Sequence, residues 1–126
     1  MQVQYNEALL MLRKSLNIYL SVVGYNHSSI ANIYGNVGLV NYHQGKYDEA
    51  YRMFQKSLDI KLSVFHHNHP GVAESYDQIG LVKNQQGKYD EALSMFQKSL
   101  NIKLTVLCLI TLALLPHITI LQLCTL

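Results

Sequence analysis

The chain has 126 residues, room for one small domain, and only 14% of them are charged, against about 25% in an average soluble protein. A net charge of +2 excludes a strongly basic surface, so nucleic-acid binding is not expected. Two cysteines exclude a disulfide-rich scaffold, the apolar content of 49% argues against a disordered chain, and the N-terminal region contains no secretory hydrophobic stretch.

The charge is unevenly distributed along the chain. Every charged residue lies between Glu7 and Lys103, and the segment Leu104–Leu126 contains none. More than two thirds of that segment is Ala, Val, Ile, Leu or Cys. The low average charge therefore belongs to the C-terminal segment, and two different kinds of sequence join near Lys103.

A repeat with a period of 42 runs through the charged part of the chain. Tyr5-Asn-Glu-Ala recurs as Tyr47-Asp-Glu-Ala and again as Tyr89-Asp-Glu-Ala. Half of the positions in 5–46 are identical in 47–88 without a gap, and more than three quarters of those in 47–64 are identical in 89–106. A period of this length is typical of solenoids built from helical hairpins.

In chain order, the pattern predicts a lone helix at about 4–23, a helical hairpin over 28–65 and a second hairpin over 70–106. Helical spacing is clearest in Lys46–Val64, which follows Gly45 and carries acidic residues in its first turn. The apolar or small positions of that helix are Tyr47, Ala50, Met53, Phe54, Ser57, Leu58 and Leu62.

The first helix of the second hairpin is predicted over His69–Gln86. Pro70 suits a helix N-terminus, and Gly87 closes the helix before a short antiparallel turn. Gly38 and Gly80 fall in the middle of equivalent helices, where glycine costs about 1 kcal/mol relative to alanine. Their recurrence at one repeat position predicts a close approach of two helices.

These residues resemble the tetratricopeptide repeat. The period of 42, and phrases such as Asn68-His-Pro and Gly87-Lys-Tyr-Asp-Glu-Ala-Leu, are similar to the repeats of the kinesin light chain type. The resemblance covers 4–106. Its small and aromatic positions are Tyr34, Val37, Gly38, Gly45, Tyr47, Ala50 and Phe54 in the first full unit, and Tyr76, Ile79, Gly80, Gly87, Tyr89, Ala92 and Phe96 in the second.

The sequence departs from the family pattern at two places. His27-Ser28 stands where the repeat has His-Pro, and the later tyrosine of the first helix is shifted or replaced at Asn41-Tyr42 and Lys83-Asn84. The resemblance implies an all-α, right-handed helical-hairpin solenoid of about 2.5 repeats with an irregular hydrophobic C-terminal tail. Its parts are a half repeat at 4–23, repeats at 28–65 and 70–106, and the tail at 107–126.

Three interpretations of the tail compete. An uncharged stretch as long as Leu104–Leu126 could span a membrane, although only Leu104–Leu115 is densely apolar and Pro116 interrupts the stretch. The segment could instead pack over the end of the solenoid. The third interpretation is a shifted reading frame, because the chain changes character where a third repeat should continue.

The frame-shift hypothesis has a paper test. With permitted codons, the third-base frame over Leu107–Cys124 can encode VSNHPSVATSYNNIAVVY, which is the missing first helix in the correct register. Codons that lack this hidden repeat would contradict the hypothesis. An uncharged tail rich in leucine and β-branched residues is also a liability for aggregation.

Residues that could perform chemistry have simpler explanations. The adjacent carboxylates Asp48-Glu49 and Asp90-Glu91 recur at predicted helix N-termini, where the helix dipole stabilises them. His66, His67 and His69 lie in a loop between hairpins without cysteine or carboxylate at zinc-ligand spacing. We therefore predict no catalytic residues, no metal site and no cofactor.

The predicted binding surface is the concave groove that first helices line in tetratricopeptide arrays. Helical spacing assigns ten residues to it: Asn32, Gly35, Asn36, Leu39, His43, Glu74, Asp77, Gln78, Leu81 and Gln85. Apart from the two leucines, these positions differ between units while the core positions repeat. The resemblance implies that the groove binds extended peptides or partner helices.

The expected function is therefore a non-enzymatic, cytoplasmic scaffold or adaptor that binds a protein or peptide partner, with neither a nucleic-acid nor a membrane partner favoured. The chain begins in mid-repeat and lacks polar capping helices, so it looks like a fragment of a longer array, and its uncapped ends would self-associate. The alternatives are a membrane-tethered repeat fragment anchored by 104–126 and a fragment of a larger multidomain signalling protein.

Overall fold

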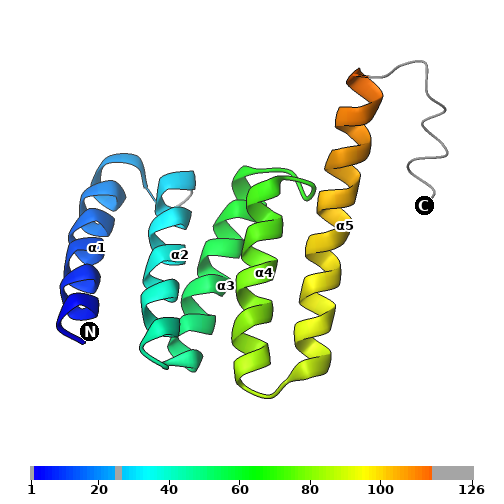
Figure 1. Ribbon diagram of the computed structural model, residues 1–126. Coiled ribbons are helices and arrows are strands. Elements are labelled where there is room, and N and C mark those ends of the chain that lie inside the picture. Colours follow the sequence, from blue (N-terminus) through cyan, green and yellow to red (C-terminus); the bar gives the residue numbers. More distant parts are fainter. Residues whose placement is uncertain (1, 25–26, 115–126) are drawn as a thin grey trace.

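The computed structural model describes residues 2–24 and 27–114, which form five α-helices and no strand. Successive helices run in opposite directions and lie in a row, as Figure 1 shows. Two of the helix pairs, α2–α3 and α4–α5, pack as hairpins, while α1 packs on α2. The helices are α1 (Gln2–Val23), α2 (Ser28–His43), α3 (Tyr47–Val64), α4 (Pro70–Gln85) and α5 (Tyr89–Leu114).

Both hairpins turn at the same glycine position. Gly45 and Gly87 have φ angles of 80° and 78°, a left-handed conformation that glycine adopts without strain. After each of them a lysine amide donates back into the helix, from Lys46 to the Asn41 carbonyl and from Lys88 to the Lys83 carbonyl, both at 2.9 Å. These bonds satisfy carbonyls at the end of the first helix, so that the chain reverses in a short turn.

Within each hairpin the first and second helices approach closely at a glycine, and the buried hydrophobic cluster joins α3, α4 and α5. A Cβ atom on Gly38 would lie 2.7 Å from the ring of Phe54, and one on Gly80 would lie 2.7 Å from the ring of Phe96. The predicted close approach at these two glycines is confirmed. The buried hydrophobic cluster comprises Ala50, Phe54, Leu58, Val72, Ala73, Ile79, Val82 and Ile102.

The structure differs from the sequence-based expectation after residue 106. The sequence pattern predicts an irregular tail from 107, but α5 continues as a helix through Leu114. The equivalent helix α3 ends at Val64, and Phe65 after it is extended. At the equivalent place in α5 the residues after Val106 are rich in leucine, which has a high helix propensity, and the helix continues. Residues 115–126 lie outside the described part of the chain.

Candidate functional site

The ten residues assigned to the groove occupy α2 and α4, the first helices of the two hairpins. Leu39 and Asp77 are half-buried, and Gly35 and Gln78 are buried. The remaining six are exposed: Asn32, Asn36, His43, Glu74, Leu81 and Gln85. The predicted set therefore has six exposed residues, most of them polar, and two buried residues beneath them. We call the buried part, which contains Gly35 and Gln78, the floor of the surface.

That floor is polar and incompletely hydrogen-bonded. A Cβ atom on Gly35 would lie 3.6 Å from the Ser57 hydroxyl and 3.9 Å from Oε1 of Gln78. The Ser57 hydroxyl donates to the carbonyl of Ala31 at 2.8 Å, and Oε1 of Gln78 has no hydrogen-bond partner among the described residues. Ser57 of α3 and Gln78 of α4 thus place polar atoms next to Gly35.

Lys61 belongs to the same floor, although sequence reasoning did not assign it there. It lies on α3, one helical turn after Ser57, and only 4% of its surface is exposed. Burial lowers the pKa of its ammonium group, and the charge of Glu74 partly offsets this effect. Among the described residues none forms an ion pair with Lys61.

The equivalent lysine in the second hairpin does have a partner. Lys103, which occupies the repeat position of Lys61, donates to the carboxylate of Asp77 at 2.7 Å. Asp77 is the repeat equivalent of Gly35. The first hairpin therefore has the lysine, Lys61, but has glycine where the second hairpin has the carboxylate of Asp77. The aligned repeats show this difference between Gly35 and Asp77.

Two hydrogen-bonded or stacked contacts tie this surface to neighbouring helices. The His43 ring stacks on Tyr5 of α1 with centroids 6.5 Å apart. The Gln85 amide donates to the Tyr42 hydroxyl at 3.3 Å, which joins α4 to α2. The first contact joins α1 to α2, and the second joins the two first helices α2 and α4 at this end of the surface.

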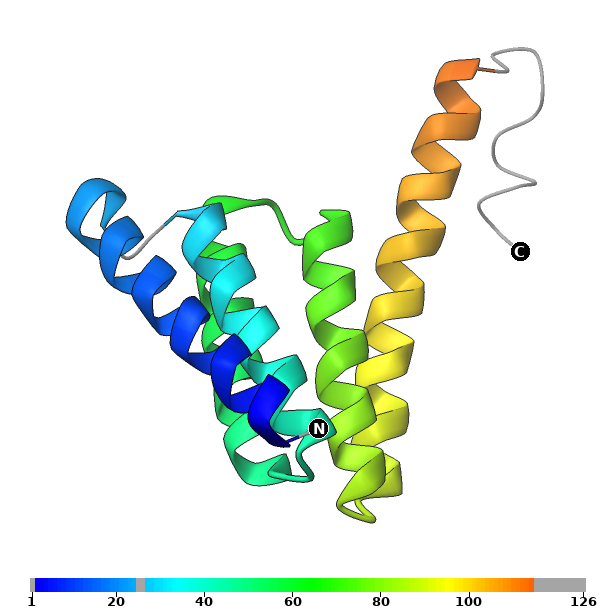
Figure 2. The same ribbon diagram turned by 60° about the vertical axis from the view of Figure 1, so that its left-hand side comes forward.

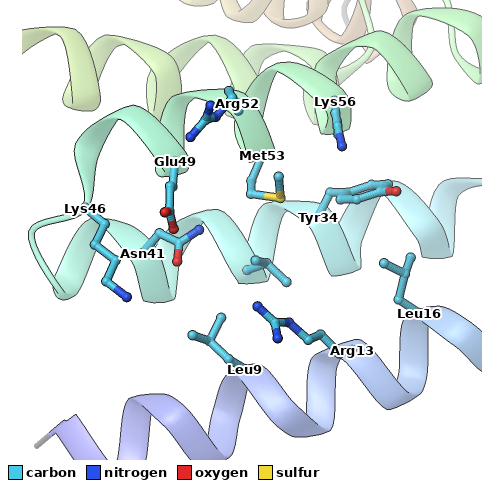
Figure 3. A pocket seen from close by; sticks show the side chains of 11 residues that line it. Leu9, Arg13, Leu16, Tyr34, Asn41, Lys46, Glu49, Arg52, Met53 and Lys56 are labelled. Carbon is cyan, nitrogen blue, oxygen red and sulfur yellow. The ribbon is translucent and has the colours of Figure 1, made fainter.

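A hollow with a volume of about 510 Å³ lies elsewhere, between α1, α2 and α3 (Figure 3). Its α2 residues Tyr34, Val37 and Asn41 lie on the opposite side of that helix from the predicted groove residues, by helical spacing. None of the ten predicted residues lines it. Its charged residues are Arg13, Lys46, Glu49, Arg52 and Lys56, so cations predominate.

A similar hollow of about 300 Å³ lies one repeat later, between α3, α4 and α5. There Lys83 bonds to Glu91 at 3.1 Å and also lies 4.1 Å from the centre of the Tyr51 ring. The recurrence indicates that both hollows arise where two second helices diverge over a first helix. They are a property of the repeat geometry rather than a site specific to one hairpin.

The adjacent carboxylates and His69 have structural roles at helix N-termini. Asp48 and Glu49, and their repeat equivalents, lie in the first turns of α3 and α5. His69 caps α4 by accepting a hydrogen bond from the Gly71 amide at 2.9 Å, and its ring stacks on Phe65 at 3.8 Å. Within the described residues no group of three potential metal ligands is present.

Comparison with known families and structures agrees with this geometry. Two tetratricopeptide repeat family models match the sequence, one at residues 29–105 and the other at residues 2–29. The chain belongs to the tetratricopeptide repeat family. Such repeats are in general protein–protein interaction modules, so the exposed surfaces of this tetratricopeptide array are its candidate binding surfaces.

Among solved structures, 41 chains match. One is the crystal structure of BtubC (BKLC) from P. vanneervenii, with a TM-score of 0.76 and 18% identity. At that identity the likeness shows the fold. The match covers 83% of this chain and 42% of that one, so the tetratricopeptide array spans less than half the length of BtubC. No curated protein sequence matches the chain.

Proposed function

We propose that the chain is a non-enzymatic, cytoplasmic scaffold or adaptor module of the kinesin light chain-like kind. The ten groove residues of α2 and α4 form what we call the α2–α4 surface. This surface binds an extended peptide that carries an acidic side chain. The observation that carries the proposal is Lys61, a buried lysine without an ion-pair partner among the described residues. Burial of the side chain disfavours the charged form of its ammonium group, so a ligand that supplies the opposite charge gains an ion pair that the described part of the chain does not make itself.

The second hairpin supplies the geometry for that interaction. Asp77 places a carboxylate 2.7 Å from the ammonium of Lys103, and the same repeat position in the first hairpin is Gly35. A ligand carboxylate above Gly35 would therefore take the place that Asp77 takes one repeat later. The comparison of the two hairpins predicts one subsite for an acidic ligand side chain in the first hairpin. In the second hairpin Asp77 already occupies the equivalent place.

The Cβ position of Gly35 is open to a side chain. A Cβ atom there would make ordinary van der Waals contacts with Ser57 and Gln78, at 3.6 and 3.9 Å, so the side chain of Gly35→Asp starts without a clash. Rotation of the Gln78 amide would exchange its unpartnered oxygen for the NH₂ group, which donates hydrogen bonds to a carboxylate. The charge of Glu74 on the same surface already acts on Lys61. It would therefore oppose a ligand carboxylate there in part, and would disfavour a second acidic residue beside the first.

The proposal is tested with short extended peptides in which one aspartate is moved along a neutral sequence, each paired with its asparagine counterpart. Fluorescence anisotropy measures the affinity. We expect an aspartate preference of about tenfold at one position, because a charge-assisted hydrogen bond contributes about 1.5–3 kcal/mol. Lys61→Met should abolish the preference, and so should Gly35→Asp, which supplies an internal carboxylate.

Lys103→Met is the matched control, because Lys103 is the repeat equivalent of Lys61 and already has Asp77 as its partner. This variant should retain the preference. Loss of the preference in Lys103→Met, or its survival in Lys61→Met, would show that the acidic subsite is not in the first hairpin. Absence of any peptide binding would contradict the groove function itself.

A second candidate function is that of a membrane-tethered repeat fragment anchored by 104–126. The observation in its favour is that α5 is the one helix in the described part of the chain that is long and apolar enough to cross a membrane, judged by length and composition. Cell fractionation tests it. Tight membrane retention that disappears on deletion of 107–126 would support the anchor, whereas a soluble full chain would remove this candidate.

The array could also serve as the interaction part of a larger multidomain signalling protein. The nucleotide sequence on both sides of the reading frame tests this candidate and the frame-shift hypothesis together. An open frame that continues into a further domain would support the larger protein.

A further inference from the structure

α5 presents leucines at every seventh position along one exposed stripe. The stripe includes Leu93, Leu100, Leu107 and Leu114, which are 58%, 53%, 59% and 72% exposed. Gln97, Leu104 and Thr111 lie between them, so the spacing alternates between four and three positions over three heptads. This is the heptad pattern of a two-stranded coiled coil, with leucine at each d position. We call these seven residues the α5 stripe.

The same face of the other second helices is covered. Tyr51 and Leu58 of α3 are the repeat equivalents of Leu93 and Leu100. Leu58 is 5% exposed within the core cluster, and Tyr51 lies beneath Lys83 of α4. In α1 the equivalent residues, Leu9 and Leu16, are half-buried. The α5 stripe is therefore equivalent to the faces of α1 and α3 that pack inside the molecule. On α5 no described helix covers this face.

We propose that the α5 stripe pairs with the α5 stripe of a second copy of this chain. A first helix of the repeat has 16 residues, as α2 and α4 show, and would leave the projecting end of α5 uncovered. A second α5 has 26 residues and matches the stripe along its whole length of about 30 Å. Figure 2 shows α5 at the edge of the solenoid, with its end projecting beyond α4.

The composition of the stripe also favours pairing with itself. Its seven residues carry no charge, so two copies meet without like-charge repulsion. Lys103, which flanks the stripe, is already paired with Asp77. In a parallel pair Gln97 would face Gln97 of the other copy, where two amides hydrogen-bond to each other, and a buried polar a position of this kind favours one register of a coiled coil.

The contact has approximately the size that a stable dimer needs. Five leucines of each copy are at least half exposed, namely Leu93, Leu100, Leu104, Leu107 and Leu114. At about 100 Å² for each leucine, ten of them remove about 1,000 Å² of apolar surface from water. Gln97, Thr111 and flanking residues add to this, and stable interfaces begin near about 1,200 Å².

This interface differs from stacking of the solenoid ends. A head-to-tail contact between the α5 end of one copy and the α1 end of the next would not close and would grow into larger species. Pairing of identical stripes is isologous and stops at two chains. It leaves the α2–α4 surface of each copy accessible, so a dimer would present two peptide-binding surfaces and gain avidity for a bivalent partner.

The test is sedimentation equilibrium of the full chain as a function of concentration, with Leu107→Glu and Leu109→Glu as a matched pair. Leu107 and Leu109 are each 59% exposed, but they lie on opposite sides of the same helix. We expect a monomer–dimer equilibrium that Leu107→Glu weakens by at least about tenfold, because each dimer loses two buried leucines. Leu109→Glu should retain the wild-type equilibrium.

Circular dichroism of both variants checks that the helices are intact, which is expected because both side chains are exposed. A chain that is monomeric at all attainable concentrations would overturn the proposal. So would species that grow beyond the dimer, or equal weakening by the two variants, which would indicate non-specific association through the whole apolar end. The peptide-binding test with Lys61→Met is independent of these outcomes.

Discussion

The hairpins α2–α3 and α4–α5 have nearly the same second helix, yet its residues occupy different environments. Lys61 is 4% exposed, whereas the side chain of Lys103 is 58% exposed. Leu58 is 5% exposed and its equivalent Leu100 is 53% exposed. The difference is α4, which covers α3, while no described helix covers α5 in this way. In a solenoid the same residue is core or surface according to its place in the array.

The largest expected effect compares the two equivalent phenylalanines. Phe54 is 1% exposed, whereas Phe96 is half-buried. Phe54→Ala should lower the free energy of unfolding by about 3–5 kcal/mol, because it opens a cavity in the core. Phe96→Ala should cost clearly less, since part of the space is open to water. Urea unfolding followed by circular dichroism measures both, and equal losses would mean that α5 is covered as well as α3.

The next effect contrasts two buried glycines of α2. Gly38→Ala should destabilise the chain by about 1–3 kcal/mol through overpacking, because its Cβ would lie 2.7 Å from the Phe54 ring. Gly35→Ala should be neutral or stabilising by up to about 1 kcal/mol, since alanine favours a helix and its nearest contact is 3.6 Å away. Thermal unfolding of the two variants compares them. A destabilised Gly35→Ala would show that position 35 has no room for a side chain, so that Gly35→Asp would not serve as the variant with an internal carboxylate.

A smaller effect concerns the pH dependence of stability at Lys61. Burial lowers the pKa of Lys61 below 10.5 in the folded chain, so between the folded-state and unfolded-state pKa values the unfolded state binds more protons and stability rises with pH. The wild-type chain should therefore gain stability relative to Lys61→Met as pH increases toward 10.5. Gly35→Asp should reduce the gain, because a carboxylate raises the pKa of Lys61. A difference between wild type and Lys61→Met that does not change with pH would contradict the unpaired, desolvated state of Lys61.

The smallest effect concerns the ion pair itself. Asp77→Asn removes the partner of Lys103, whose pairing is solvent-exposed, and should cost about 0–1 kcal/mol. Urea unfolding at low and high salt measures this, with the difference from wild type vanishing at high salt. A loss well above about 1 kcal/mol would mean that Lys103 is desolvated by a neighbour, which is the environment of Lys61.

Much of the architecture was predictable because its signals are local. The positive φ at Gly45 and Gly87, the proline at Pro70 and the spacing of Ala50 and Phe54 each act within one helical turn. The glycines in the middle of α2 and α4 were also informative, since a glycine retained inside a helix needs a close neighbour. The end of α5 was not predictable in this way. The change of sequence after Lys103 indicates where the repeat ends, but it does not indicate where the helix ends, because leucine-rich residues continue a helix readily.

The candidate site was only partly predictable. Helical spacing selects Asn32, Asn36 and their equivalents because it depends on one helix at a time. It does not select Lys61, since the burial of that lysine depends on α4, which lies outside its own hairpin.

The sequence by itself determined the repeat, the helices, their turns and the glycine contacts, because these depend on residues close together in the chain or on one aligned position. Only the tertiary structure decided that Lys61 is buried without an ion-pair partner among the described residues while Lys103 has one, and that the leucines of α5 are exposed while their equivalents on α3 are covered. Those differences arise from the presence or absence of a neighbouring helix, which removes water from one copy of a sequence and leaves it on the other.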